Sequence, residues 1–229
     1  LPDAFDGFTI TQISDIHSGS FDDRPSVLRG LKMAQDLGSD MMVFTGDLVN
    51  NVADEIEPWL KDMPDLQAAY GKFSILGNHD YGDYVTWDSV EEKEENQRSL
   101  HAHHHTMGFR LMLNEAIPIE KDGHKITLVG VENWGVGFHK KGDLQMAMRD
   151  VPPEDFKILL SHDPSHWEEE VRSHMHHVHL TLSGHTHGMQ FGVEIGGFKW
   201  SPVKYRYPRW AGLYEETGKY LYVNRGFGF

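Results

Sequence analysis

The 229-residue chain contains no cysteine, and this absence excludes three kinds of chemistry. A disulfide framework, a thiolate metal site and a thiol nucleophile are all ruled out. No apolar run approaches the roughly 20 residues that cross a bilayer as a helix. The first residue is Leu1 and not Met, so we expect a processed or excised fragment from which any signal peptide or membrane anchor is missing.

Basic residues are scarce, because 21 Lys and Arg stand against 35 Asp and Glu and leave a formal net charge of −14. Nucleic acid backbones bind basic stripes, so we expect no nucleic acid partner. A phosphate site in such a protein needs a local positive centre, which a metal ion would supply. The composition is otherwise ordinary for a globular protein. Because no repeat, linker or low-complexity segment interrupts the chain, we expect one domain over residues 1–229.

The stretch around which the chain is organised is Ser-Gly-His-Thr-His-Gly at residues 183–188, directly after a short apolar, strand-prone run. His185 and His187 are one residue apart, so in extended backbone both imidazoles point to the same side. Gly184 and Gly188 remove side chains on either flank, which allows a close approach of the backbone. This pattern predicts half of a metal site.

Other predicted strands also end in ligand-type side chains. These strands are Phe8–Ile13, Met41–Phe44, Phe73–Leu76 and Phe156–Leu160. They are followed by Asp15 and His17, by Asp47, by Asn78 and His79, and by His162. Residues at strand ends in this order are typical of an α/β domain. Carboxylate, carboxamide and imidazole donors together favour Mn, Fe, Zn or Co over Ca or Mg alone. Because there are too many donors for one tetrahedral ion, we expect two ions that share a carboxylate.

The rest of the chain predicts connecting elements. Helices are expected near residues 27–35, in pieces over 56–70, over 86–107, and at 144–148 and 167–174. Further strands are expected at 111–119 and 125–131, around an Asp122-Gly123 turn, and at 190–195, 213–215 and 220–223. We place His101, His103, His104 and His105 at a solvated helix end, with adventitious metal binding as the alternative. His174, His176, His177 and His179 are expected at the surface.

In this order, Asp-x-His, Gly-Asp, Gly-Asn-His-Asp, a single His after a strand and Gly-His-x-His resemble the calcineurin-like metallophosphoesterase family, over essentially the whole chain. The resemblance implies a four-layer α/β sandwich of two mixed β-sheets flanked by helices. It implies two divalent metal ions, one bound by Asp15, His17 and His187 and the other by Asn78, His162 and His185, with Asp47 between them. It also implies that His79 contacts the phosphate and protonates the leaving group, with Asp80 as its partner.

The activity implied is dinuclear metal-dependent hydrolysis of a phosphoester. Two ions a few ångströms apart bind both the attacking and the leaving side of a phosphoryl group. A bridging water that loses its proton near neutral pH becomes the nucleophile, and a histidine is suited to protonate the departing oxygen. The alternative of another class is a scaffold of the same fold that has lost catalysis. Since loss of the leaving-group histidine is the usual mark of such scaffolds, the presence of His79 favours an enzyme.

Finer phrases, such as Gly-Asn-His-Asp-Tyr-Gly at residues 77–82, are similar to a subgroup of bacterial membrane-associated or exported phosphoesterases of the YkuE and YaeI type. Such chains usually continue beyond the point where this one stops, at Phe229. Some of these relatives hydrolyse the diphosphate of UDP-diacylglucosamine. The resemblance leads us to expect a membrane-associated or exported bacterial protein, with a cytoplasmic location left open.

A local basic and aromatic stretch follows the histidine motif and bears on the substrate. Its members are Lys199, Trp200, Lys204, Tyr205, Arg206, Tyr207, Arg209 and Trp210. Together with Asn133 and Trp134 it would form a wall that selects the leaving group, although the aromatics could instead cover the sandwich. We therefore expect a phosphodiester or diphosphate with a bulky, lipid-linked substituent, handled at a membrane surface. The alternative is a general phosphodiesterase or phosphatase that acts on soluble small molecules.

Overall fold

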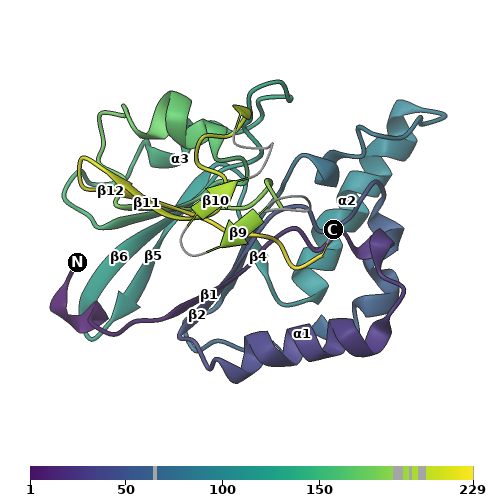
Figure 1. The fold of residues 1–229 in the computed structure, drawn as a ribbon, viewed down its shortest axis with the longest axis horizontal. Coiled ribbons are helices and arrows are strands. Elements are labelled where there is room, and N and C mark those ends of the chain that lie inside the picture. The colour runs from purple at the N-terminus through teal and green to yellow at the C-terminus, as the bar shows by residue number, and fades with distance from the viewer. Residues whose placement is uncertain (64–65, 188–192, 196–197, 201–204, 229) are drawn as a thin grey trace.

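The computed structural model describes residues 1–63, 66–187, 193–195, 198–200 and 205–228, without the side chains of 193–195 and 198–200. Two larger β-sheets form its centre, with helices on their outer sides (Figure 1). The order of layers is helices, four-stranded sheet, six-stranded sheet, helices. This arrangement confirms the predicted α/β sandwich.

The four-stranded sheet has the order β1-β2-β3-β4 and is parallel throughout. Its strands are β1 (Ile10–Ile13), β2 (Met41–Thr45), β3 (Lys72–Ile75) and β4 (Arg110–Leu111). The prediction of two mixed sheets is corrected here, because helical crossovers link the strands and return the chain in the same direction. The main crossovers are α1 (Arg24–Asp36), the 3₁₀ helix Ala53–Trp59 and α2 (Val90–Thr106).

The six-stranded sheet has the order β11-β12-β8-β7-β6-β5 and is mixed. Its strands are β5 (Glu115–Lys121), β6 (His124–Gly130), β7 (Lys157–Leu160), β8 (Leu180–Ser183), β11 (Gly212–Glu216) and β12 (Lys219–Val223). The two edge pairs are antiparallel hairpins, and the inner pairs are parallel. At the predicted turn, Asp122 and Gly123 both have positive φ, 50° and 77°, as a tight two-residue hairpin requires. A separate pair joins β9 (Val193–Ile195) and β10 (Phe198–Trp200).

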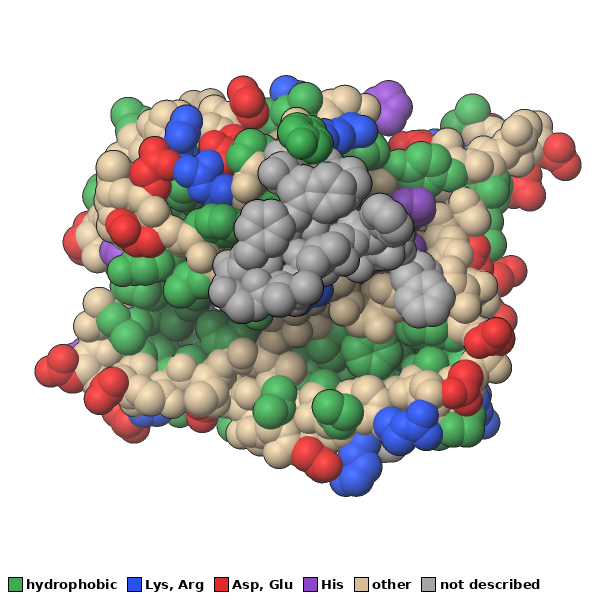
Figure 2. All heavy atoms as spheres, in the orientation of Figure 1, with side chains coloured by type: hydrophobic (Ala, Val, Ile, Leu, Met, Phe, Trp, Pro, Cys, Tyr) green, Lys and Arg blue, Asp and Glu red, His purple; other side chains and the backbone are tan. Residues whose placement is uncertain are grey.

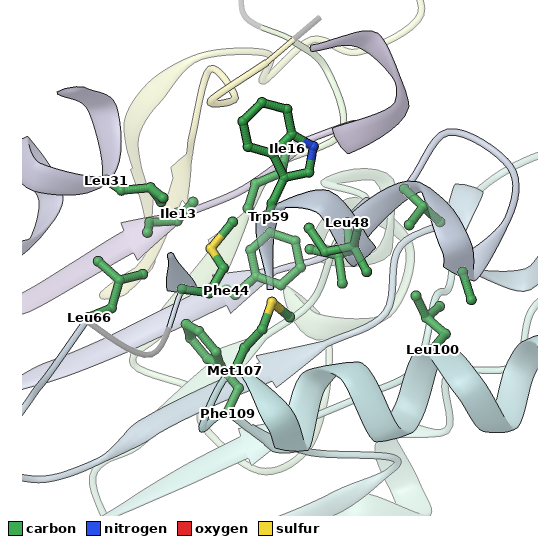
Figure 3. Packing of buried hydrophobic residues seen from close by; sticks show 14 of the residues in the cluster. Ile13, Ile16, Leu31, Phe44, Leu48, Trp59, Leu66, Leu100, Met107 and Phe109 are labelled. Carbon is green, nitrogen blue, oxygen red and sulfur yellow. The ribbon is translucent and has the colours of Figure 1, made fainter. Parts of the chain in front are cut away.

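Strand β2 is buried on both faces, which explains its unbroken apolar sequence. Met41 and Val43 face the second sheet, whereas Met42 and Phe44 face the helices. Figure 3 shows Phe44 packed among the aliphatic and aromatic side chains of this outer core. Burial of each such side chain contributes about 1.5–3 kcal/mol. The packed layers therefore form the rigid base from which the loops at the strand ends emerge.

Helix α2 begins where the sequence supplies a capping group. The Ser89 side chain accepts a hydrogen bond of 3.1 Å from the backbone N–H of Glu92, at the start of α2. The remaining helical pieces are α3 (Leu144–Met148), a π-helical turn at Trp167–Val171, and short 3₁₀ turns at Asp3–Phe5, Ser18–Ser20 and His79–Tyr81. Among the described residues, none of these helices combines the length and the apolar character needed to cross a bilayer.

One of the histidines predicted at the surface differs from expectation. His104, in the last turn of α2, is completely buried against Phe44, and this burial lowers the pKa of its imidazole to about 3. The prediction of a solvated position is wrong for this histidine, because the apolar face of α2 extends to its last turn. The four histidines between residues 174 and 179 are half-buried on the segment that leads into β8.

Candidate metal centre

The C-terminal ends of strands from both sheets meet at one place. Strands β1, β2 and β3 are parallel neighbours, so the loops that follow them emerge at the same edge. Strands β7 and β8 do the same in the second sheet. A hydrogen bond of 2.7 Å from His162 Nδ1 to the carbonyl oxygen of Thr45 joins the two edges. The five predicted strand ends therefore converge.

The backbone at this junction adopts an uncommon conformation. A positive φ costs an L-residue other than glycine about 1–2 kcal/mol, and such residues gather at functional sites. Eight such residues occur in the described chain, and five of them are predicted ligands. These are Asp15 (φ 53°), His17 (48°), Asp47 (59°), His185 (71°) and His187 (50°). The strain thus coincides with the predicted site.

Two glycines allow the loops to come this close. A Cβ atom on Gly184 would lie 1.9 Å from Ser14 Oγ and 2.3 Å from Asp15 Oδ2. A Cβ atom on Gly77 would lie 2.2 Å from Asp47 Oδ1. Any larger residue would displace a carboxylate of the site. The close approach predicted at Gly184 is confirmed.

The first cluster contains Asp15, His17, Asp47 and His187, whose donor atoms all lie within 4.8 Å of one another. His17 Nε2 lies 3.0 Å from His187 Nε2 and 3.6 Å from Asp47 Oδ2. His187 Nε2 lies 3.5 Å from Asp15 Oδ1. Burial lowers the pKa of His17 to about 4, so its imidazole is neutral and can offer a lone pair. Imidazole nitrogens and carboxylates that converge in this way are suited to surround a cation.

The second cluster contains Asp47, His162 and His185, so Asp47 belongs to both clusters. His162 Nε2 lies 3.1 Å from Asp47 Oδ2 and 3.2 Å from His185 Nδ1. Burial alone would lower the pKa of His162, but the charge of Asp47 outweighs it and raises that pKa to about 10. Burial lowers the pKa of His185 to about 4. Without a metal, the proton on His162 therefore balances the buried charge of Asp47.

Asn78, which the resemblance assigns to the second ion, carries an oxygen without a partner among the described residues. Its side chain is buried, and Oδ1 accepts no hydrogen bond from the described residues. Its Nδ2 donates to Tyr84 Oη at 2.8 Å, which fixes the orientation of the amide. A buried acceptor without a partner is costly, and a cation would satisfy it. The residues present therefore fit two divalent ions that share Asp47.

Outer hydrogen bonds orient the imidazoles of the second cluster. The bond to Thr45 leaves His162 Nε2 free to face the cluster. His185 Nε2 donates to Tyr207 Oη at 2.7 Å, and this hydroxyl donates to Asp163 Oδ2 at 3.2 Å. These bonds leave Nδ1 of His185 free to bind a metal. Hydrogen-bond partners of metal-binding histidines commonly fix the ring in this way. Sequence reasoning missed this role for Asp163 and Tyr207, although Asp163 directly follows a predicted ligand.

His79 lies beside the clusters and is absent from both. Its backbone N–H donates to Asp47 Oδ1 at 2.9 Å, and its Nδ1 donates to the carbonyl oxygen of Asn50 at 2.7 Å. Because a carbonyl only accepts, Nδ1 carries a proton and Nε2 is the nitrogen available for chemistry. The ring packs edge-on against His17, with 4.8 Å between centroids. This placement agrees with a group that contacts substrate.

The prediction that Asp80 is the partner of His79 is wrong. The Asp80 carboxylate is fully buried and accepts backbone N–H groups from Asp47, Leu48, Val49 and Gly77, at 2.8–3.3 Å. The 3₁₀ turn at residues 79–81 directs the two neighbouring side chains to different sides. Burial, together with the charge of Asp47, raises the pKa of Asp80 to about 7. Asp80 therefore holds the loop that carries Asp47.

The structure places the two loop residues of the predicted substrate wall differently. Trp134 is buried, its ring stacked on His166 at 4.9 Å and covered by Lys140 Nζ at 3.9 Å, so its assignment to the wall is corrected. Asn133 is also buried, 2% exposed, but it lines a cavity beside Asn78. Both residues belong to a loop that packs its larger side chain inward.

In the basic and aromatic stretch, Tyr207 and Trp210 are buried and form a small apolar cluster with Ala211. Arg209 is paired with Glu168 and Glu216, so its charge is already balanced. Arg206 lies over the rings of Phe138 and Tyr207, 5.7 Å from each centroid, and stays near the site. Tyr205 is 78% exposed. The predictions for Lys199, Trp200 and Lys204 fall on side chains outside the described part of the chain.

Comparison with known proteins assigns the chain to the same family that its sequence motifs resemble. Residues 8–189 match the family model of the calcineurin-like phosphoesterases. The chain is 30% identical over 234 residues to the uncharacterized metallophosphoesterase YkuE of Bacillus subtilis, with 100% of this chain and 74% of YkuE covered. It is 27% identical over 270 residues to the UDP-2,3-diacylglucosamine pyrophosphatase LpxG of Chlamydia trachomatis, covering 97% of this chain and 78% of LpxG.

A transmembrane protein with a metallophosphoesterase domain from Danio rerio is 25% identical over 240 residues; the match covers all of this chain and 50% of that relative, so this chain spans half its length. Among solved structures, the sulfate thiohydrolase SoxB of Thermus thermophilus is similar in fold, with a TM-score of 0.50 at 12% identity, covering 89% of this chain and 37% of SoxB. The chain belongs to the calcineurin-like phosphoesterase family, and it is a metal-dependent phosphoesterase.

Proposed function

We propose that this protein is a dinuclear phosphoesterase that hydrolyses a phosphodiester or diphosphate bond in a lipid-linked amphiphile. The observation that carries the dinuclear assignment is the position of Asp47, which belongs to both donor clusters at once. The unpartnered Oδ1 of Asn78 supports a cation in the second cluster. Mn, Zn, Fe and Co are the candidates, because they accept both imidazole and carboxylate ligands.

Two ions at these clusters would supply positive charge for the phosphoryl oxygens and an activated water for attack. The protein contributes the proton for the leaving group. His79 Nδ1–H is held by the Asn50 carbonyl, so the proton that can move is the one on Nε2 of the imidazolium. The backbone bond from His79 to Asp47 keeps this ring beside the metal ligands. His79 is therefore the proposed general acid.

An apolar cavity between α1 and the C-terminal segment supports a lipid substituent. Its volume is about 680 Å³, and its apolar wall includes Phe21, Val27, Met33 and Phe227. The segment that forms one side is bonded to the ligand loop, through Gly228 N–H to the Asp15 carbonyl at 2.8 Å. Figure 2 shows hydrophobic side chains set back in a hollow on this face, above α1. Such a cavity is suited to an acyl chain whose phosphate lies at the metal clusters.

The similarity to LpxG also supports a lipid-linked substrate, because the name of that relative describes a pyrophosphatase for a diacylated sugar nucleotide. A lipid substrate would bring the protein to a membrane surface, and we propose such an association. Arg209 is not expected to bind the substrate phosphate, because its charge is already paired.

The test is a comparison of kcat/KM for UDP-diacylglucosamine, a phospholipid, a cyclic nucleotide and a simple monoester, with each candidate metal. We expect the lipid-linked substrates to be preferred. Met33→Lys should reduce kcat/KM for them and leave bis-p-nitrophenyl phosphate unaffected, because Met33 lines the cavity and is 71% exposed. Leu37→Lys is the matched control, at the C-cap residue that directly follows the same helix, 69% exposed and outside the lining of this cavity.

Preference for the monoester, or equal effects of the two lysine variants, would refute the lipid assignment and favour a general phosphatase or phosphodiesterase. Absence of turnover with every metal and substrate would favour a scaffold of this fold. Asp47→Asn should weaken binding at both clusters, because the shared carboxylate loses its charge.

A further inference from the structure

A second cavity borders the candidate metal centre at Asn78. Its volume is about 420 Å³, and its lining includes the predicted ligand Asn78. The other side chains that matter here are Tyr81, Tyr84, Asn133 and Phe138. Direct contact with a predicted ligand places this cavity where a substituent of the bound phosphoester would extend.

Aromatic rings stand on two sides of this cavity. The Tyr84 ring lies 4.5 Å from the His79 ring, and its hydroxyl accepts the Asn78 amide bond. The Phe138 ring meets His185 edge-on at 5.2 Å. Tyr84 is 49% exposed and therefore has free surface for a ligand. The two rings flank the side of the site from which His79 would protonate the leaving group.

The floor of the cavity contains a polar atom without a partner. Asn133 is 2% exposed, and its Oδ1 accepts no hydrogen bond from the described residues. Its backbone is held at both ends, by the bond from Asn133 N–H to Tyr81 Oη at 3.1 Å and by two 3.0 Å bonds from Lys141 and Gly142 to its carbonyl. The backbone of Asn133 is thus fixed in place, and the structure leaves the buried Oδ1 acceptor for a ligand donor.

We propose that this cavity binds a polar ring attached to the phosphate on the leaving-group side, namely a sugar or a nucleoside. Asn133 Oδ1 accepts an O–H or N–H from the ring, and Tyr84 and Phe138 pack against its faces. An acyl chain is excluded from this position, because it would leave the buried acceptor unpaired. The inference rests on the proposed phosphoesterase function and divides the substrate between a ring subsite here and an apolar cavity at α1.

The experiment measures binding and uses the metal-loaded His79→Ala protein, which keeps both clusters. The probes are inorganic phosphate, glycerol 3-phosphate, glucose 1-phosphate and uridine 5′-monophosphate, titrated by calorimetry. We expect at least one ring phosphate to bind about 10-fold more tightly than glycerol 3-phosphate, as one hydrogen bond and a ring contact supply. The preferred ring distinguishes a sugar from a nucleoside.

Asn133→Leu and Phe138→Ala, each made in the His79→Ala protein, should remove this preference and leave affinity for inorganic phosphate unchanged. Val136→Ala is the matched control, an exposed side chain of the same loop that does not line the cavity. Equal binding of ring phosphates and glycerol 3-phosphate, or a loss that extends to inorganic phosphate, would overturn the ring subsite. Failure of the proposed function is a different result, in which the wild-type protein neither binds inorganic phosphate nor hydrolyses bis-p-nitrophenyl phosphate.

Discussion

Replacement of Asp80 by Asn is the sharpest test of how the loop that carries Asp47 is held. The carboxylate accepts four backbone N–H groups, two on each oxygen. An Asn side chain has one acceptor oxygen, so two buried donors lose their partner whichever way the amide turns. Each unpaired buried donor costs about 1–3 kcal/mol, and relief of repulsion with Asp47 offsets part of that. We expect the free energy of unfolding to fall by about 2–4 kcal/mol.

The assay is urea unfolding of the metal-free protein at pH 8, where Asp80 is ionised because its pKa is raised to about 7. Asp83→Asn is the control, since Asp83 forms only a partly exposed ion pair with Lys93, and it should cost less than about 1 kcal/mol. Metal affinity should fall in Asp80→Asn, because the loop of Asp47 loosens. A variant as stable as the wild type, with only its pH–rate profile changed, would refute the positioning role and restore Asp80 as a partner of His79.

Three further predictions concern the site itself. His79→Ala should keep both metals and reduce turnover by about 10²–10⁴-fold for a poor leaving group, with a smaller effect for nitrophenolate; a metal-free variant in elemental analysis would make His79 a ligand instead. Tyr207→Phe should lower metal affinity about 10-fold or more, because His185 loses the hydroxyl that orients it; unchanged affinity in a chelator competition would exclude that role. Metal binding at the second cluster should release a proton, because the pKa of His162 in the metal-free protein is raised to about 10. Since this pKa lies above that of an unfolded histidine, the His162–Asp47 pair stabilises the metal-free fold fully below about pH 6.5 and loses this contribution as pH rises through about 10. Apparent metal affinity should accordingly rise about tenfold per pH unit between pH 7 and 9. Calorimetry in buffers of different ionisation enthalpy measures the released proton, and zero release would contradict the protonated state.

The sequence predicted the strands and the ligand groups because both have short-range signals. Alternating or continuous apolar runs identified β1, β2, β3, β7 and β8, and the polar residues directly after them were already grouped. Parallel pairing then brings these ends to the same edge without any long-range information. The same local reasoning confirmed the turn at Asp122 and the close approach at Gly184.

The failures have a common physical origin in side-chain direction. Asp80 is adjacent to His79 in sequence, but a 3₁₀ turn sends its carboxylate to backbone donors of another loop. Trp134 and His104 occupy polar stretches of sequence, yet tertiary packing buries both. Tyr207 reaches His185 from 22 residues away through a chain path that no local pattern specifies. Contacts of this kind depend on how layers pack, which a single sequence does not state.

The arrangement of the ligands has an energetic consequence that links the fold to metal binding. Five ligands hold positive φ, at about 1–2 kcal/mol each, and two buried carboxylates lie in one cluster. Backbone bonds to Asp80 and the imidazole bonds to Thr45 and Tyr207 hold this strained geometry through contacts within the protein. Because these contacts already orient the donors, less ordering of the loops would oppose the binding of a cation. A bound cation would replace the proton of His162 and reduce the repulsion between Asp15 and Asp47, so the contacts that hold the strained loops would also favour cation binding.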